Sequence, residues 1–232
     1  MKLNLAVDFT PLKKYPDFRL LWGSGLISYF GSMITYVSLP FQIKQLTDSY
    51  LAVGLMGLVE IVPLIVFGLY GGVLADRADR KKMIWATEFA ALCLTSILLI
   101  NALVPNPKLW LLYVVAALFS AVDGLQRPSA DAILPRLVDH DDLPSASALM
   151  SLRWQFGVIT GPALAGILIA TSGVKAGFAI DVFTYVISLL LLAKVRSIKP
   201  TQSSEKPTLS SVVEGLRYAT SRKDLMGTYL VD

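Results

Sequence analysis

Charged residues are scarce in this sequence of 232 residues. Aspartate, glutamate, lysine and arginine make up 16% of it, and the hydrophobic share is 54%. Soluble domains carry roughly 25% charged residues, so this balance excludes an ordinary soluble domain and makes lipid part of the expected surroundings. The one cysteine, Cys93, excludes a disulfide within the chain. Because it lies inside an apolar run, we expect it to be a small buried hydrophobe.

Other scarce features narrow the function. The single histidine, His140, lies among carboxylates in a polar connector without a cluster of metal ligands, so no metal is assigned. The sequence has no phosphate-binding loop for ATP and no nucleophile beside a positioned base, so it predicts neither an enzyme nor a cofactor. The basic residues are scattered over short connectors and form no stripe with aromatic residues, which argues against nucleic acid as a partner.

Six segments are long and apolar enough to cross a bilayer, which takes about 20 residues. The sequence therefore predicts an all-α membrane protein with spans at 20–43, 51–74, 83–104, 109–130, 146–170 and 176–193. Residues 1–19 form an N-terminal segment, and 20–195 form the six-helix domain. Residues 196–224 are polar and basic and are expected to form a cytoplasmic central loop. Apolar positions at helical spacing predict an amphipathic helix in it, which either braces the two halves or rests on lipid headgroups. Residues 225–232 are typical of the start of a seventh helix, truncated at the end of the chain.

Lysine and arginine are distributed unevenly between the two sides of these spans. Sixteen fall on the side of the N-terminus and three on the other side. Basic residues accumulate on the cytoplasmic side of a membrane, so the distribution predicts a multi-pass protein of the inner (plasma) membrane with a cytoplasmic N-terminus. The charged loop at 76–82 is then cytoplasmic. A topology signal explains its positive charges but not its aspartates.

Two stretches resemble motifs of the major facilitator superfamily. The stretch GGVLADRADRKK resembles its loop motif, G-x-L-A-D-R-x-G-R-K, with Asp79 in place of the usual glycine. The matching residues are Gly72, Leu74, Ala75, Asp76, Arg77, Arg80 and Lys81. The stretch GVITGPALAG resembles the antiporter motif G-x-x-x-G-P-x-x-G-G, with Ala165 in place of a glycine. Its matching residues are Gly157, Gly161, Pro162 and Gly166. The wider sequence is similar to the enterobactin-exporter-like efflux branch of that superfamily.

The resemblance implies the N-terminal half of a major facilitator fold, a six-helix bundle built from two inverted three-helix repeats. It also implies a missing C-terminal six-helix half as partner. The implied function is that of a secondary active transporter, an antiporter for proton-coupled export of small amphipathic molecules such as drugs or siderophores. Protons are favoured because no ATP site is present and carboxylates lie within the spans. The alternatives are an uptake permease of the same fold, and a six-helix fragment or scaffold without transport activity of its own.

The resemblance also implies roles for the motif residues. In that superfamily the loop latches the cytoplasmic faces of the two halves in the outward-open state. The latch candidates are Gly72, Asp76, Arg77, Arg80 and Lys81, with Asp131 as the expected partner of Arg80. The alternative for this loop is a solvated basic turn.

In the fifth span, Gly157, Gly161 and Ala165 recur every four residues and form a smooth stripe that a neighbouring helix can approach closely. Pro162 is expected to bend the helix. Such stripes usually mean generic helix packing. The match to the antiporter motif predicts packing of this helix against the opposite half of a transporter.

Ionisable residues inside spans are functional hypotheses by default. Asp123, Arg127 and Asp131 recur every four residues and therefore share one helix face. Counting about 1.5 Å per residue places Asp123 and Arg153 at nearly the same depth, which predicts that they pair, and Arg127 is likewise predicted to reach Glu88.

Three residues are the candidates for proton coupling: Asp123, Arg153 and Glu60, which lies close to mid-membrane. The alternative is a permanent ion pair of Asp123 and Arg153 that only positions helices. Family architecture places the third and sixth helices at the periphery, so Glu88 and Asp181 are expected to be structural.

Overall fold

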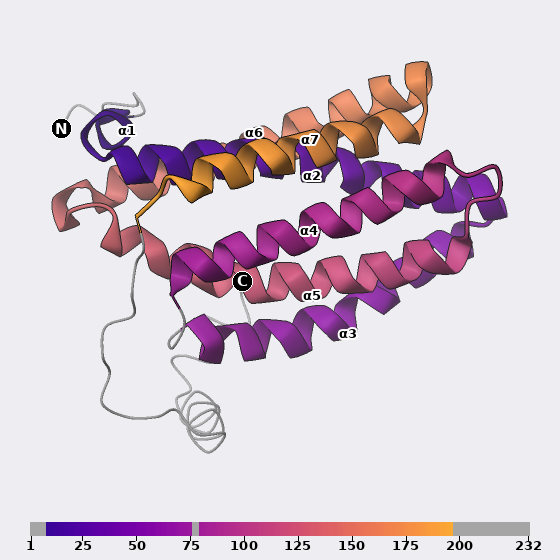
Figure 1. Ribbon diagram of the computed structural model, residues 1–232, viewed down its shortest axis with the longest axis horizontal. Coiled ribbons are helices and arrows are strands. Elements are labelled where there is room, and N and C mark those ends of the chain that lie inside the picture. Colours follow the sequence, from indigo (N-terminus) through magenta and orange to yellow (C-terminus); the bar gives the residue numbers. More distant parts are fainter. Residues whose placement is uncertain (1–7, 76–78, 197–232) are drawn as a thin grey trace, which may run out of the picture. The chain divides into compact units, whose positions relative to one another are not determined.

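The computed structural model describes residues 8–75 and 79–196. Seven α-helices and two short 3₁₀ turns make up nearly all of this part (Figure 1). The helices are α1 (Thr10–Lys14), α2 (Pro16–Thr47), α3 (Tyr50–Ala75), α4 (Arg80–Leu103), α5 (Leu109–Ile133), α6 (Leu143–Ser172) and α7 (Val174–Ala193). The 3₁₀ turns Leu134–Arg136 and His140–Asp142 connect α5 to α6.

The six predicted spans are confirmed. Within the described residues, α2 to α7 are each long and apolar enough to cross a membrane. Their ends differ from the predicted ends by a few residues. The predicted amphipathic helix and the start of a seventh helix lie outside the described residues.

Contacts between the helices repeat in pairs. Helix α3 packs on α5, and in the same way α2 packs on α6. Helix α2 also packs on α7, and α4 likewise packs on α5. Helix α4 contacts α7 directly. Exchanging α2 with α5, α3 with α6 and α4 with α7 maps this set of contacts onto itself. The exchange relates the first three spans to the last three, which agrees with two inverted repeats.

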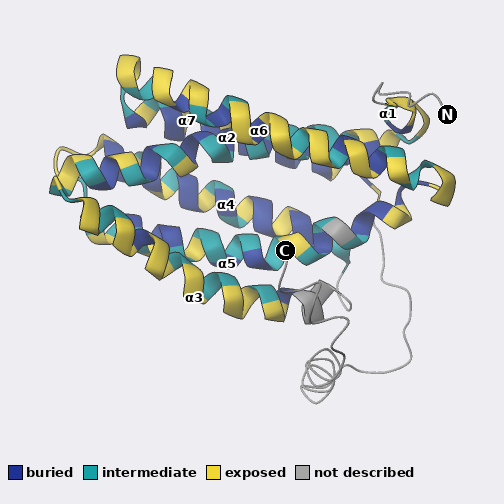
Figure 2. Cartoon of the chain, turned by 180° about the vertical axis from the view of Figure 1, so that it is seen from behind, coloured by how far each residue is buried: buried dark blue, intermediate teal, exposed yellow. Residues whose placement is uncertain are grey.

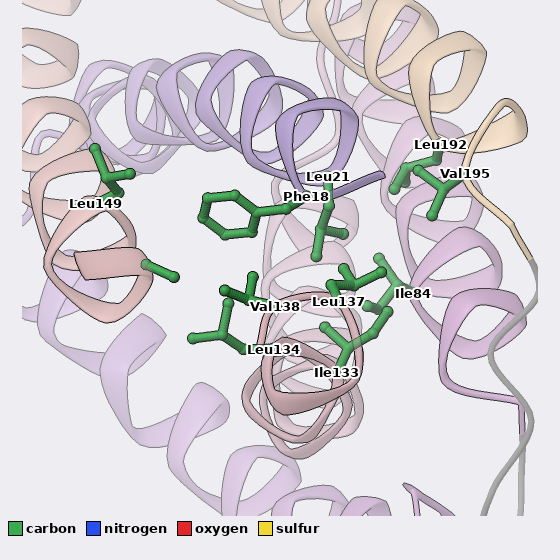
Figure 3. Close-up of a cluster of buried hydrophobic side chains, with 11 residues drawn as sticks. Phe18, Leu21, Ile84, Ile133, Leu134, Leu137, Val138, Leu149, Leu192 and Val195 are labelled. Carbon is green, nitrogen blue, oxygen red and sulfur yellow. The ribbon is translucent and has the colours of Figure 1, made fainter. Parts of the chain in front are cut away.

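Two apolar clusters fill the ends of the bundle. One lies where α2 and α4 begin and α7 ends, and Figure 3 shows its side chains pointing toward one another. It contains Phe18, Leu21, Ile84, Ile133, Leu134, Leu137, Val138, Ala146, Leu149, Leu192 and Val195. The other cluster lies toward the opposite end of the same helices and includes Leu39, Ile43, Leu98, Leu112 and Phe178. Buried polar side chains such as Ser28, Glu88 and Asp181 lie on these helices between the two clusters.

Burial differs sharply among the helices. Far more residues of α2, α4 and α7 are buried than of α3 and α6, whose outer faces are exposed along most of their length (Figure 2). The two most exposed helices are exchanged by the repeat relation. Their apolar outer faces are therefore left for lipid or for another set of helices.

The expectation for Cys93 is wrong, because its side chain is exposed on α4. Leu94, the next residue, is buried. One residue turns a helix by about 100°, so an apolar run does not reveal which of its members face the interior.

Backbones approach most closely where α3 crosses α5. A Cβ atom on Gly124 of α5 would lie 2.8 Å from the backbone nitrogen of Gly68 and 3.0 Å from the backbone oxygen of Leu64. A Cβ atom on Gly71 would lie 2.8 Å from the backbone oxygen of Gly124. Only hydrogen fits at these positions.

Candidate transport site

The aspartate that replaces a glycine in the loop motif begins α4. The Asp79 carboxylate accepts hydrogen bonds from the backbone N–H groups of Lys81 at 3.0 Å and Lys82 at 3.3 Å. It is thus an N-cap, which satisfies donors that have no partner within the helix. The departure from the motif has a local structural reason.

The cations that follow connect α4 to two neighbouring helix ends. Arg80 Nη1 donates to the backbone oxygen of Ala132, in the last turn of α5, at 2.6 Å. Lys81 Nζ donates to the oxygen of Ala193, the last residue of α7, at 3.1 Å. Carbonyls at a helix C-terminus lack intrahelical donors and carry partial negative charge. The motif therefore holds three helices of this chain together at one end.

The remaining latch candidates stay predictions. Asp76 and Arg77 lie outside the described residues, and so do the surroundings of Gly72 and the side chain of Asp131. Arg80 does reach the turn of α5 that carries Asp131.

A second polar cluster lies at the end of the bundle where α2 begins. Lys14 Nζ lies 2.8 Å from Asp142 Oδ2 and 3.4 Å from Asp139 Oδ2. The Tyr15 hydroxyl contacts the same two carboxylates at 2.7 and 2.8 Å. Hydrogen bonds from Tyr15 and Lys14 hold the pKa of Asp139 below its ordinary value. The cluster joins α1 to the connector between α5 and α6.

The small-residue stripe of α6 faces α2. A Cβ atom on Gly157 would lie 2.3 Å from Tyr29 Cδ1, and one on Gly161 would lie 2.3 Å from Met33 Cβ. Ala165 continues the stripe and is fully buried. Helix α2 of the same chain thus covers this stripe, and packing of α6 against an opposite half stays a prediction. Gly166, the last matching glycine of the motif, faces open space.

Asp123 has a different partner from the one that depth counting predicted. Its Oδ2 lies 2.8 Å from Nη2 of Arg127, one turn along α5, and the two side chains are 47% and 69% exposed. Arg153 of α6 instead places its guanidinium over Gly25 of α2, where a Cβ atom would lie 2.1 Å from Nη1. Equal depth on two helices does not fix how each is rotated about its axis.

These charges nevertheless share one region. Asp123, Arg127 and Arg153 all act electrostatically on the Tyr29 hydroxyl of α2. We call this group from α2, α5 and α6 the polar face, defined as Tyr29, Asp123, Arg127 and Arg153. Glu60 stands apart on α3, where its half-buried side chain has no hydrogen-bond or ion-pair partner among the described residues.

The predicted contact between Arg127 and Glu88 is wrong. Glu88 is only 5% exposed, and its Oε1 accepts hydrogen bonds from Ser28 Oγ at 3.0 Å and Gln126 Nε2 at 3.1 Å. Arg127 points outward from α5, whereas Glu88 points into the bundle.

Asp181 of α7 is fully buried and is surrounded by threonine hydroxyls. Thr35 donates to Oδ2 at 2.6 Å, Thr95 donates to Oδ2 at 3.2 Å, and Thr184 donates to Oδ1 at 3.3 Å. Gly31 leaves room for this arrangement, since a Cβ atom there would lie 2.6 Å from Asp181 Oδ1. Three helices thus converge on one carboxylate.

Sequence reasoning expected Glu88 and Asp181 to be structural but did not predict the groups around them, although α2 carries a signal for these groups. Small or polar residues recur along it every three or four positions, and all are buried. They are Ser24, Ser28, Gly31, Thr35, Ser38 and Gln42. Such a stripe marks a face on which other helices bring polar groups close.

Comparisons with known proteins agree with this architecture. Residues 6–230 match the family described as transmembrane secretion effector, within the major facilitator superfamily. The chain is 31% identical over 223 residues to the enterobactin exporter EntS of Shigella boydii serotype 18, covering 94% of this chain and 52% of that protein. It is 30% identical over 235 residues to the enterobactin exporter EntS of Citrobacter koseri, covering 99% of this chain and 54% of that protein. The chain spans about half the length of these relatives. It is a multi-pass membrane protein, and it belongs to the transmembrane secretion effector family of major facilitator transporters.

Proposed function

We propose that the chain supplies the N-terminal half of a proton-coupled exporter of small amphipathic molecules such as drugs or siderophores. The observation that carries the proposal is the polar face, because charged groups inside an apolar span mark substrate or ion pathways. Asp123 and Arg127 are partly exposed on α5 although the helix is long and apolar enough to span a membrane. The similarity to enterobactin exporters supports export of a siderophore-like molecule.

The missing partner in this proposal is a second six-helix half. The apolar outer faces of α3 and α6 are exposed in this chain, which supports a further set of helices packing there. The relatives are about twice as long as the matched region. The substrate path is then enclosed by both halves.

The proposal also includes an orientation in the cell. The end of the bundle that carries Lys14, Arg80 and Lys81 lies in the cytoplasm, and the protein resides in the inner membrane. The excess of basic residues on that side supports this orientation. The bonds from Arg80 and Lys81 to the ends of α5 and α7 then stabilise the cytoplasmic end during movement between the two halves.

Asp123→Asn tests the role of the polar face in the complete carrier. We expect at least a tenfold loss of gradient-driven export with little change in stability, because exposed ion pairs contribute only about 0–1 kcal/mol. The amide cannot be ionised, so it cannot alternate between binding and releasing a proton. Substrate binding and uphill export in membrane vesicles are the measurements.

Asp48→Asn serves as the matched control, since Asp48 also pairs with a cation four residues away but lies at the end of α2 and is almost fully exposed. It should leave export unchanged. Full gradient-driven export by a stable Asp123→Asn carrier would contradict the role given to Asp123.

A further inference from the structure

Glu88 and Asp181 are not used by the polar face, yet they are the most deeply buried carboxylates that the structure describes. They are 5% and 0% exposed. Their hydrogen bonds are with hydroxyl and amide groups, and neither forms an ion pair with another residue that the structure describes. An ionised carboxylate in a dry interior is strongly unfavourable without a counter-charge, and such a group is neutralised instead.

The two carboxylates occupy equivalent places in the two repeats. Glu88 lies eight residues after Arg80, where α4 begins, and Asp181 lies seven residues after Val174, where α7 begins. Helices α4 and α7 are exchanged by the repeat relation, and they run in opposite directions, since Lys81 at the start of α4 bonds to the end of α7. The pair is therefore placed nearly symmetrically about the middle of the bundle.

Three helices align their polar residues at the levels of the two carboxylates. Seven residues separate the two levels on each helix, which is two helical turns or about 10 Å. The pairs are Ser28 and Thr35 on α2, Glu88 and Thr95 on α4, and Ser188 and Asp181 on α7. Between the levels, Ser32 Oγ of α2 lies 2.7 Å from the Tyr185 hydroxyl of α7. A column of polar groups thus connects the neighbourhoods of the two carboxylates.

The two sites differ in how well their oxygens are satisfied. Both oxygens of Asp181 accept hydrogen bonds. At Glu88, Oε1 accepts two, but the buried Oε2 has no partner. Ser188 interacts with this carboxylate, and its hydroxyl is also fully buried without a hydrogen bond of acceptable geometry. Two unsatisfied oxygen atoms thus belong to neighbouring side chains in the interior, where each is costly.

Either Ser188 Oγ donates to an ionised Oε2, or a proton on Oε2 resolves both deficits. Burial of Glu88 without an ion pair among the described residues favours the proton. Placed on Oε2 of Glu88, it makes that atom a donor, and Ser188 Oγ becomes its acceptor. A metal cation would require about six oxygen ligands. Among the described residues, Ser188 Oγ is the only neighbouring side-chain oxygen that is buried beside this carboxylate without a hydrogen bond. The charged or titratable groups that face Glu88 are Arg153 from α6 and Asp181 and Tyr185 from α7.

We propose that Glu88 is a second, buried proton-binding site of this protein, positioned by Ser188 and coupled electrostatically to Asp181. Helices α2 and α5 contribute only uncharged donors to it, Ser28 and Gln126. Arg153 acts on both Glu88 and Tyr29 of the polar face. The use of this site in transport rests on the proposed function, whereas binding of the proton does not.

Infrared difference spectroscopy of the chain in lipid nanodiscs tests the proposal, because the carbonyl stretch of a protonated carboxylic acid is separate from that of a carboxylate. We expect a protonated-acid band at neutral pH that disappears as the pH is raised and returns when it is lowered. Glu88→Gln should reduce the pH-dependent part of this band, and the remainder belongs to other buried carboxylic acids such as Asp181. Asp48→Asn, at an almost fully exposed aspartate, should leave it unchanged.

A wild-type band that is absent or insensitive to pH, or one that persists fully in Glu88→Gln, would overturn the proposal. If Glu88→Gln does not fold, Ser188→Ala provides the test, since loss of the hydrogen bond should shift the frequency of the band. An unshifted band in that variant would equally overturn it. The measurement needs neither substrate nor a gradient, so a failure of proton-coupled export leaves its result unaffected.

Discussion

Gly124→Ala is expected to destabilise the protein by about 2 kcal/mol or more, the upper range for overpacking a close contact. The added methyl group would lie 2.8 Å from the nitrogen of Gly68 and 3.0 Å from the oxygen of Leu64. Both atoms belong to the backbone of α3, so no side-chain rotation relieves the clash and the two helices must separate. The measurement is the free energy of unfolding in mixed lipid and detergent micelles.

Gly54→Ala is the matched control on α3. No atom lies within 4 Å of a Cβ at this position, and alanine favours a helix over glycine by about 1 kcal/mol. The control should be neutral or slightly stabilising. Equal effects of the two substitutions would show that α3 and α5 do not cross as closely as described.

Asp181→Ala is expected to cost about 2–6 kcal/mol, because it leaves the buried hydroxyls of Thr35 and Thr95 without an acceptor at about 1–3 kcal/mol each. Thr184 is less affected, since its hydroxyl also donates to the backbone oxygen of residue 181 at 2.8 Å. The apparent melting temperature of the purified protein is the measurement.

Asp181→Asn separates the loss of hydrogen bonds from the loss of the ionisable group. Asparagine has the same shape and keeps one carbonyl acceptor, so it should retain most of the stability. If Asp181→Ala proves as stable as the wild type, the three threonine hydroxyls do not depend on this carboxylate and the centre has been misassigned.

Much of the fold was predictable because a bilayer imposes a simple rule on sequence. Each span must be a long apolar helix, so the six spans could be located by length and composition. The shared helix face of Asp123 and Arg127 was also predictable from their four-residue spacing, although their pairing with each other was not predicted. These features depend on residues that are close in the sequence.

The candidate site was less predictable because it depends on how helices are rotated against one another. Depth counting placed Asp123 level with Arg153, but the rotation of α6 directs Arg153 toward Gly25. The same reasoning predicted a contact between Glu88 and Arg127, whereas Glu88 accepts a hydrogen bond from Ser28 of α2. Periodicity shows which residues share a face, but it does not show which faces meet.

The stripe of the antiporter motif illustrates a second limit. Its small residues correctly indicated a close helix contact, and Gly157 and Gly161 do adjoin Tyr29 and Met33. The partner found for the stripe is α2, and packing of the helix against an opposite half stays a prediction. A small-residue stripe indicates how near a neighbour lies without identifying it.

The proposed function is export of small amphipathic molecules in exchange for protons. Its most direct test is proton movement in membrane vesicles of the complete carrier when siderophores or amphipathic dyes are added. We expect substrate to drive proton movement in the opposite direction, and collapse of the pH gradient to reduce uphill export at least tenfold. Export that continues undiminished without a pH gradient, and with no proton movement on addition of substrate, would contradict the claim.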